Sequence, residues 1–420
     1  MPHPVGILHY SAPPIIGGVE SVIAHHARLF QEAGTEVQIV AGRGAPFDPQ
    51  VQMHIIPELD SRHPRVLAVG EQLAQGNVPE AFFTLRDEIK TRLQPYLQSL
   101  GILIAHNVVT LHKNLPLTAA LYDLVVEEQQ MPLIAYVHDL AWKDPLYLPE
   151  LHEGYPWDLL RIRWSGVQYV TISRHRQQWL QELLGLSPEE VPVIYPGISL
   201  FEFLDIGDVA RRLVRQLHLL DHWPLFLYPT RITRRKNIEG SLAIAAELRK
   251  TFPELALIIT GPPGPHNPKN QTYLEELREL RRTLHLDNHV YFLYEYGEKD
   301  QPLLLPDKAV RDFYRLCDVL LFPSRREGFG IPLLEAGVLQ MPIFASRLAP
   351  FEEIAEDMIH YFDPDAPPDQ IAATIAETLR DHTALALKRR VIHNFAYEKT
   401  FYRDLLPLVR SIMYTRFPTS

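Results

Sequence analysis

The segment VLLFPSRREGFGIPLLEAG, residues Val319–Gly337, predicts a buried strand, a glycine-containing loop and a helix that opens at Pro332. Proline is favoured in the first turn of a helix, because its missing N–H would have no partner there. The free amides of Leu333 and Leu334 are therefore expected to point at an anion, as amides at helix N-termini do. A strand that runs through such a loop into a helix is typical of a parallel α/β sheet.

Two carboxylates, Glu327 and Glu335, flank this turn. A carboxylate accepts hydrogen bonds from the neighbouring hydroxyls of a sugar or ribose, and the loop glycines Gly328 and Gly330 let the backbone approach a phosphate closely. The alternative is an acidic loop followed by an ordinary surface glutamate. The proline, the glycines and the preceding strand favour a loop that binds a molecule containing both sugar and phosphate.

Short β-branched or aromatic runs alternate with longer stretches of helical period along the whole chain, which predicts parallel sheets with crossover helices. In the N-terminal half the predicted strands are Val5–His9, Val37–Ala41, Ile102–His106, Leu133–His138, Val167–Ile172 and Val193–Tyr195. After Pro196 and Gly197 they are Leu225–Tyr228, Leu255–Thr260, Val290–Leu293, Val319–Phe322 and Ile343–Ala345. The sequence therefore predicts an α/β protein of two doubly wound halves joined within residues 195–222, with ligands in a cleft between them.

The composition of the 420 residues fits two soluble domains, with 46% hydrophobic and 22% charged residues. A formal net charge of -10 argues against a nucleic-acid binder. Cys317 is the only cysteine, so neither disulfides nor a cysteine metal site is expected. No signal peptide and no membrane-spanning apolar run are recognisable, and we expect a cytoplasmic protein without a transmembrane segment.

A basic turn, PTRITRRKN, follows the strand Leu225–Tyr228. The guanidinium of Arg231 and the ammonium of Lys236 are five positions apart and suit a clamp for a diphosphate leaving group. Arg234 and Arg235 add positive charge nearby. The alternative is a solvated basic turn without a ligand.

Further polar residues follow strands of the N-terminal half. Gly17 and Gly18 form a turn between the first strand and a helix, where helix amides would face a ligand. His138 leaves its strand at the carboxyl end and could hydrogen-bond a sugar hydroxyl or share a developing charge. Three neighbours are candidate acceptor-binding residues, namely His106, Asn107 and Asp139. The alternatives are an ordinary turn and a structural His–Asp pair.

Two motifs imitate metal sites. Asp363–Asp365 reads DPD but lies in a proline-rich turn before a helix, where aspartates serve as turn residues. His25 and His26 lie within an amphipathic helix without suitably spaced cysteine or carboxylate partners. We therefore expect no bound metal.

Taken together, these motifs resemble those of the retaining GT-B glycosyltransferases of family four. REGFGIPLLEAG is similar to the Glu-x7-Glu signature of that family, and PTRITRRKN to its Arg-x4-Lys clamp. GGVE, VHD, TISRHR and IYPGIS occur in the order of the family, and the segment from Asn394 to Tyr414 is similar to its closing helix. The resemblance covers nearly the whole chain. It implies Rossmann-like domains at residues 1–200 and 201–395, and a helix at 396–420 that returns to the first domain.

The resemblance also implies roles for individual residues. Glu327 would hold hydroxyls of the transferred sugar, Glu335 the donor ribose, and Arg231 with Lys236 the departing diphosphate. His138 would lie near the hexose and the reaction centre. The remaining donor-binding residues would be Gly17, Gly18, Tyr294, Glu295, Gly328, Phe329, Gly330, Ile331 and Leu334.

The implied activity is transfer of a hexose, with retention and without a metal or cofactor, from a nucleotide sugar to a hydroxyl group. GDP-mannose and UDP-glucose are the leading donors, and a small polar acceptor is preferred: a sugar, sugar phosphate or glycerate derivative. A homo-oligomer is possible. Alternatives are a lipid-linked or polysaccharide acceptor at a membrane surface, a phosphorylase, a sugar-nucleotide epimerase and a non-catalytic sugar-binding protein.

Overall fold

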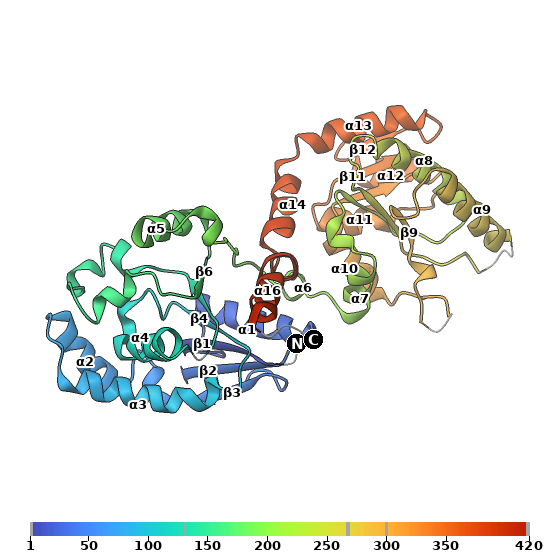
Figure 1. Cartoon of the computed structure of the whole chain (residues 1–420). Coiled ribbons are helices and arrows are strands. Elements are labelled where there is room, and N and C mark those ends of the chain that lie inside the picture. The colour runs from blue at the N-terminus through green and yellow to red at the C-terminus, as the bar shows by residue number, and fades with distance from the viewer. Residues whose placement is uncertain (1–2, 130, 266–268, 299–300, 417–420) are drawn as a thin grey trace. The chain divides into compact units, whose positions relative to one another are not determined.

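The computed structural model describes residues 3–129, 131–265, 269–298 and 301–416 (Figure 1). Two compact units make up the chain. The first unit combines residues 1–199 with the segment from Asn394 on, and the second unit comprises Leu200–His393. Residues 417–420 of the predicted closing helix lie outside the described residues.

The sheet of the first unit has six parallel strands in the order β3-β2-β1-β4-β5-β6. The strands are β1 (Val5–Ser11), β2 (Val37–Arg43), β3 (Gln52–Ile55), β4 (Ile102–His106), β5 (Leu133–Val137) and β6 (Val167–Thr171). Every residue of β1, β4 and β5 is buried. Strands buried on both faces are expected in a parallel sheet that helices cover on both sides.

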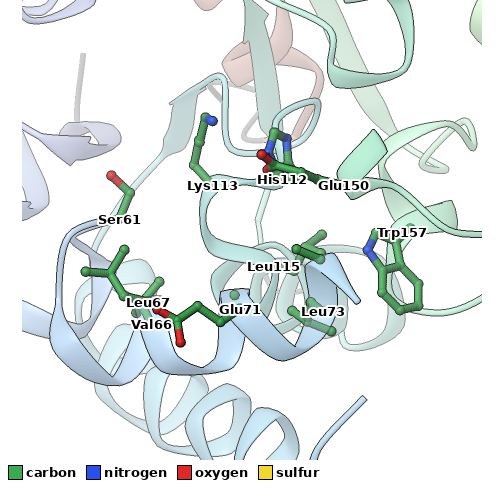
Figure 2. Close-up of a pocket in the computed structure, with 12 residues that line it drawn as sticks. Ser61, Val66, Leu67, Glu71, Leu73, His112, Lys113, Leu115, Glu150 and Trp157 are labelled. Atoms are coloured by element: carbon green, nitrogen blue, oxygen red, sulfur yellow. The ribbon is translucent and has the colours of Figure 1, made fainter. Parts of the chain in front are cut away.

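Helices cover the two faces of this sheet. They are α1 (Gly18–Glu32), α2 (Pro64–Ala74), α3 (Glu80–Leu97), α4 (Leu115–Tyr122), α5 (Arg174–Leu184), α15 (Tyr397–Thr400) and α16 (Leu406–Arg416). Ile7 of β1 belongs to a core cluster with Phe30 of α1 and with Phe401. The rings of these two phenylalanines meet edge to face, with their centroids 4.7 Å apart. Leu8, the next residue of β1, belongs to the opposite core with α2 to α4, part of which Figure 2 shows. The C-terminal segment therefore forms part of the first unit.

The sheet of the second unit has the order β12-β11-β10-β7-β8-β9, again all parallel. Its strands are β7 (Leu225–Tyr228), β8 (Ala256–Ile259), β9 (Val290–Phe292), β10 (Val319–Phe322), β11 (Ile343–Ser346) and β12 (His360–Phe362). Numbered within its own unit, each sheet has the strand order 3-2-1-4-5-6, which is that of a Rossmann fold. The predicted class of two doubly wound domains, GT-B, is confirmed.

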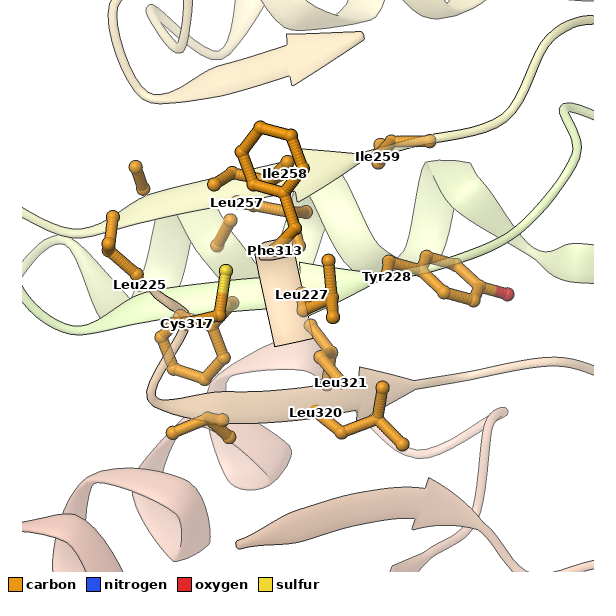
Figure 3. Close-up of a cluster of buried hydrophobic side chains, with 14 of the residues drawn as sticks. Leu225, Leu227, Tyr228, Leu257, Ile258, Ile259, Phe313, Cys317, Leu320 and Leu321 are labelled. Atoms are coloured by element: carbon orange, nitrogen blue, oxygen red, sulfur yellow. The ribbon is translucent and has the colours of Figure 1, made fainter. Parts of the chain in front are cut away.

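The helices of the second unit are α6 (Leu200–Phe203), α7 (Asp208–Gln216), α8 (Ile238–Leu248), α9 (Lys269–Thr283), α10 (Asp307–Leu316), α11 (Ile331–Val338), α12 (Ala349–Ala355), α13 (Pro368–Arg380) and α14 (Thr383–Phe395). One core cluster joins them to the sheet, and Phe313 of α10 shares it with Leu227 and Ile258 (Figure 3). Cys317 is a buried free thiol in this cluster, and burial raises its pKa. Its environment is that of a structural cysteine.

The predicted strand Val193–Tyr195 is wrong. Val193 forms only an isolated bridge to Thr171, and residues 194 and 195 are not in a strand. The sequence analysis also missed β3 and β12, which are the outermost strands of their sheets. Within the described residues, no helix is long and apolar enough to cross a membrane.

Candidate functional site

The candidate site residues follow the strands at which each sheet reverses its order. These switch points lie between β1 and β4 in the first unit and between β7 and β10 in the second. Ligands of doubly wound sheets bind beyond the carboxyl ends of the strands at such points. Lys236 follows β7 and Glu327 follows β10, whereas Gly17 follows β1 and His106 ends β4.

In the second unit, Glu327 accepts hydrogen bonds from two cations. Lys236 Nζ donates to Oε1, and Arg235 Nη1 donates to Oε2 at 3.1 Å. The side chains of Lys236 and Glu327 are 12% and 9% exposed, so water screens their interaction little. Burial lowers the pKa of the Lys236 ammonium, and the contact with Glu327 opposes this shift. The predicted basic turn and acidic loop therefore meet in one charged cluster.

The loop conformations are fixed by buried polar side chains that the sequence analysis did not single out. The Tyr228 hydroxyl contacts the Lys236 carbonyl and lies 3.0 Å from Ser324 Oγ. Asn237 has a φ of 52° and donates from Nδ2 to the Pro323 carbonyl at 3.1 Å. Asparagine is among the few residues that tolerate this left-handed conformation. These bonds join the turn after β7 to the loop after β10.

Arg231 does not join this cluster. Its side chain is exposed, and no hydrogen bond or ion pair of its guanidinium occurs within the described parts of the chain. The Arg231 segment is instead held through its backbone, where the Gly261 amide donates to the Thr230 carbonyl at 3.0 Å. A Cβ on Gly261 would lie 2.3 Å from that carbonyl oxygen, so only glycine fits there. Arg231 is free to contact a ligand, and Arg235 takes the position beside Glu327.

Helix α11 begins at Ile331, one residue before the predicted start at Pro332. The Leu333 amide donates to the Gly330 carbonyl at 2.9 Å, so the prediction of a free amide at Leu333 is wrong. A tight first turn has satisfied this N–H internally. Glu335 is exposed and accepts a hydrogen bond from the Tyr314 hydroxyl at 2.5 Å, a partner that the sequence analysis missed. Burial is the main cause that raises the pKa of the Tyr314 hydroxyl, and the hydrogen bond to Glu335 raises it further.

The apolar residues of the loop and of the first turn of α11 are open to solvent. The exposed fractions are 51% for Phe329, 60% for Ile331 and 45% for Leu334. Large apolar side chains exposed together often mark a binding surface. The loop glycines differ from each other, since Gly330 has a φ of 137° whereas Gly328 is not in the positive-φ region.

Replacing Gly330 by alanine is expected to destabilise the second unit by about 1–3 kcal/mol. The new Cβ would lie 2.9 Å from the Phe351 ring, on a backbone that only glycine adopts easily. Gly328→Ala is the matched control, because its Cβ would meet no atom within 4 Å. Calorimetric melting of both variants measures the difference. Equal melting temperatures would contradict the assigned strain.

Tyr294 and Glu295, predicted to lie near a nucleotide base, follow β9. Glu295 receives hydrogen bonds from Arg278 Nε at 2.6 Å and Arg281 Nη1 at 2.9 Å. Both carboxylate oxygens are thus engaged by cations of α9, and the place of Glu295 near a nucleotide base stays a prediction. Tyr294 is partly buried and packs against the core of the second unit.

In the first unit, His138 lies at the carboxyl end of β5 and is 6% exposed. His106 is fully buried and its Nδ1 lies 2.9 Å from His138 Nε2. Asn107 is also buried, and its Oδ1 accepts hydrogen bonds from the His138 and Asp139 amides at 2.8 and 3.0 Å. His106 and Asn107 thus support the loop after β5, and their contact with an acceptor stays a prediction.

Asp139 is the partly exposed member of the predicted acceptor set. Its Oδ1 lies 3.3 Å from Arg176 Nη2, and its side chain is 47% exposed. Arg176 belongs to the quoted segment TISRHR and also donates from Nε to the His138 carbonyl at 3.1 Å. Asp139 thus keeps an oxygen available beside His138.

The protonation states of these histidines follow from their surroundings. Burial lowers the pKa of His138 to about 3 and lowers that of His106 well below its usual value, so both rings are neutral at pH 7. His106 Nε2 is buried without a hydrogen-bond partner in the described structure. A proton there would be an unpaired buried donor, so we assign it to Nδ1, which donates to His138 Nε2. His138 then carries its own proton on Nδ1.

The first turn of α1 contains a negative charge that the sequence analysis did not weigh. Glu20 accepts a hydrogen bond from the Ser11 hydroxyl. A Cβ on Gly17 would lie 2.1 Å from Glu20 Oε2, so this carboxylate covers the start of α1. Gly18 remains open, with no atom within 4 Å of a Cβ position.

Both metal-like motifs have structural explanations. The Asp365 amide donates to Asp363 Oδ1 at 2.9 Å, as in an aspartate turn. His25 stacks on Tyr397 at 4.5 Å, and His26 is buried in the core of the first unit. In the parts of the chain that the structure describes, no group of three or more histidine, cysteine or acidic residues could hold a metal ion.

Comparisons with known proteins show the family of the chain. Residues 16–201 match the family model "Glycosyltransferase Family 4", and residues 211–398 match the model "Glycosyl transferases group 1". The two models together span nearly the whole chain, so the chain belongs to the family-4 type of glycosyltransferases. The protein is therefore an enzyme that transfers sugars.

Individual relatives are distant. A D-inositol 3-phosphate glycosyltransferase of Salinispora tropica is 25% identical over 95% of this chain and 82% of its own length. A mannosylglucosylglycerate synthase of Petrotoga mobilis is 24% identical over 59% of each chain. Among solved structures, sucrose-phosphate synthase from Thermosynechococcus elongatus is 17% identical, covering 98% of this chain and 100% of that one, with a TM-score of 0.38.

Proposed function

We propose that the protein is a retaining, metal-independent hexosyltransferase that moves mannose or glucose from a nucleotide diphosphate sugar to a hydroxyl of a small polar acceptor. GDP-mannose and UDP-glucose are the donors of choice. The observation that carries this proposal is the cluster of Lys236, Arg235 and Glu327 at the switch point of the second sheet. A diphosphate needs cations, and hexose hydroxyls need a carboxylate acceptor.

Donor binding would exchange partners within this cluster. Lys236 and the exposed Arg231 take the diphosphate, and Glu327 turns to the hexose hydroxyls. Glu335 accepts a hydrogen bond from a ribose hydroxyl, while Tyr314 orients the Glu335 carboxylate. His138, neutral and protonated on Nδ1, donates to a hexose hydroxyl. It does not serve as an acid at pH 7, because its pKa is about 3.

In the proposed step, the bond from the anomeric carbon to the diphosphate oxygen breaks. The acceptor oxygen bonds to that carbon on the same face, and the acceptor proton passes to an oxygen of the departing diphosphate. Lys236 and Arg231 stabilise the charge that develops on this leaving group. The names of the relatives, which mention inositol 3-phosphate and mannosylglucosylglycerate, support a small polar acceptor.

A thermal-shift screen against nucleotide sugars tests the donor. A donor present at about 100 times its Kd is expected to add about 2.7 kcal/mol of stability. The anomeric configuration of the product, read by NMR, tests retention. Absence of any stabilising nucleotide sugar would contradict the proposal.

Product analysis separates the alternatives. A non-catalytic binding protein would be stabilised by the sugar without releasing nucleotide, and an epimerase would form free sugar and no glycoside. A phosphorylase would show the absorbance of pyridoxal phosphate. Transfer that requires lipid vesicles would favour an acceptor at a membrane surface.

A further inference from the structure

The first unit contains a cavity of about 300 Å³ that no predicted site residue lines (Figure 2). This volume is at the lower end of the range for small-molecule sites, about 300–1,000 Å³. Helix α2 forms one wall, and the segments after β4 and β5 form the other. The lining residues are Ser61, Val66, Leu67, Gly70, Glu71, Leu73, Ala74, His112, Lys113, Leu115, Glu150 and Trp157.

Hydrogen bonds join the cavity wall to the loops that carry His138. Thr110 Oγ1 donates to the Asp139 carbonyl at 2.7 Å, and the Ala141 amide donates to the Thr110 carbonyl at 2.9 Å. His112 and Lys113 follow Thr110 directly in the chain. Asn114 then donates from Nδ2 to the Glu58 carbonyl at 2.9 Å and so fixes this segment against the residues that precede α2. The segment that forms this wall is therefore hydrogen-bonded to the loop that follows His138.

The charges around the cavity disfavour an anion. Glu71 and Glu150 contribute two carboxylates, and Lys113, whose Nζ lies 4.1 Å over the Tyr147 ring, contributes one ammonium. Burial lowers the pKa of His112, so this ring is mostly neutral at pH 7 and donates from Nε2 to Glu150 Oε2 at 2.8 Å. The lining thus carries net negative charge. A phosphate would be repelled, whereas hydroxyl groups find both acceptors and donors.

The remaining lining is apolar. Val66, Leu67, Leu73 and Leu115 present aliphatic surface, and Trp157 adds an aromatic wall (Figure 2). The C–H face of a sugar ring, or an apolar group attached to it, suits such a surface, because burial of apolar area is favourable. Polar groups on one part of a cavity and apolar groups on another fit an amphipathic ligand.

Gly70 keeps the cavity open. It lies inside α2, where glycine costs about 1 kcal/mol relative to alanine. A Cβ at this position would meet no atom within 4 Å, so a side chain there would extend into open space. The position therefore offers a way to fill the cavity without disturbing the core.

We propose that this cavity binds the acceptor of the sugar transfer, and that the acceptor is an uncharged, hydroxylated molecule with an apolar face. This inference rests on the proposed function and narrows its acceptor. It excludes phosphorylated acceptors from this cavity, although the name of the Salinispora relative contains a phosphorylated one.

The first experiment blocks the cavity. Gly70→Leu is expected to lower kcat/KM for sugar transfer to butyl β-glucoside at least 10-fold. The stabilisation of the chain by a nucleotide sugar should not change, because the diphosphate and ribose contacts are assigned to the second unit and Gly70 belongs to none of the proposed donor contacts. Ala68→Leu is the matched control, since Ala68 is exposed on the same helix and does not line the cavity. Unchanged acceptor kinetics in Gly70→Leu would overturn the proposal.

The second experiment measures binding without turnover. The full chain, labelled with ¹⁵N, is titrated with methyl β-glucoside, butyl β-glucoside, myo-inositol and glucose 6-phosphate. The indole N–H signal of Trp157 is identified from its loss in Trp157→Phe. This signal is expected to shift with the uncharged probes, and butyl β-glucoside should produce the shift at the lowest concentration. Gly70→Leu should abolish these shifts.

No shift with any uncharged probe, or tighter binding of glucose 6-phosphate, would overturn the proposal. Failure of the proposed function would look different. In that case no nucleotide sugar would stabilise the wild-type chain, an outcome on which Gly70 has no influence.

Discussion

Replacing Lys236 by methionine is expected to slow sugar transfer about 10²–10³-fold, equivalent to about 2.7–4 kcal/mol of transition-state stabilisation. The ammonium is largely buried against Glu327, so its interaction with a leaving diphosphate would be screened little by water. Removing it takes one positive charge from the site of the proposed leaving group and leaves the Glu327 carboxylate with Arg235 as its cationic partner. Steady-state kinetics with saturating donor measures the loss in kcat.

Arg234→Met is the matched control for this variant. Arg234 belongs to the same turn, but its side chain is 62% exposed and pairs with Glu276 at 2.6 Å, away from Glu327. Its removal is expected to change kcat less than about 2-fold, in keeping with the small energies of exposed ion pairs. Similar losses in both variants would mean that the turn acts only through its overall charge.

The first unit is expected to lose stability steeply below pH 6.5. Burial lowers the pKa of His26 and of His138 to about 3, and lowers that of His106 in the same direction. The unfolded chain binds protons on these rings near pH 6.5, whereas the folded unit does not until far lower pH. Well below pH 6.5, each ring therefore lowers the free energy of unfolding by about 1.4 kcal/mol for each further drop of one pH unit. His26 and His138 together lower it by about 2.8 kcal/mol per pH unit.

Urea unfolding at several pH values measures this slope. Tryptophan fluorescence reports mainly on the first unit, which holds Trp142, Trp157, Trp164 and Trp179, whereas only Trp223 lies in the second. In His26→Phe, phenylalanine places a ring of similar size among Tyr136, Tyr397 and Phe401. The slope of the unfolding free energy with pH should then fall by the contribution of about one proton. An unchanged slope would contradict a neutral, buried His26.

The interior strands were predictable from the sequence because both of their faces are buried. Their residues form apolar runs such as Val319–Phe322, whose bounds agree with β10. The edge strands β3 and β12 lack this signal, whereas the edge strand β9 is buried and was predicted. In β3 both end residues, Gln52 and Ile55, are exposed, and β12 has no fully buried residue. The hydrogen bonds to a neighbouring strand that define these edges leave little trace in local sequence.

The loops of the candidate site were predictable, but the partners of their side chains were not. Spacing favoured Arg231 as the partner of Lys236, whereas the structure turns Arg235 toward Glu327. The tight turn at Arg234–Lys236 and the left-handed Asn237 decide this choice. In the same way, the end of a strand indicated that His106 is near the site, but only packing around it shows that the ring is buried.

The return of the chain to the first unit at Asn394 has a consequence for biosynthesis. Residues 200–393 form a continuous domain that can fold as soon as they leave the ribosome. The first unit must wait, because Phe401, Leu405 and Val409 cover apolar residues such as Ile7 and Ile104. Until those turns are synthesised, the sheet of the first unit keeps an uncovered face. Of the two units, the one whose translation begins earlier is thus completed after the other.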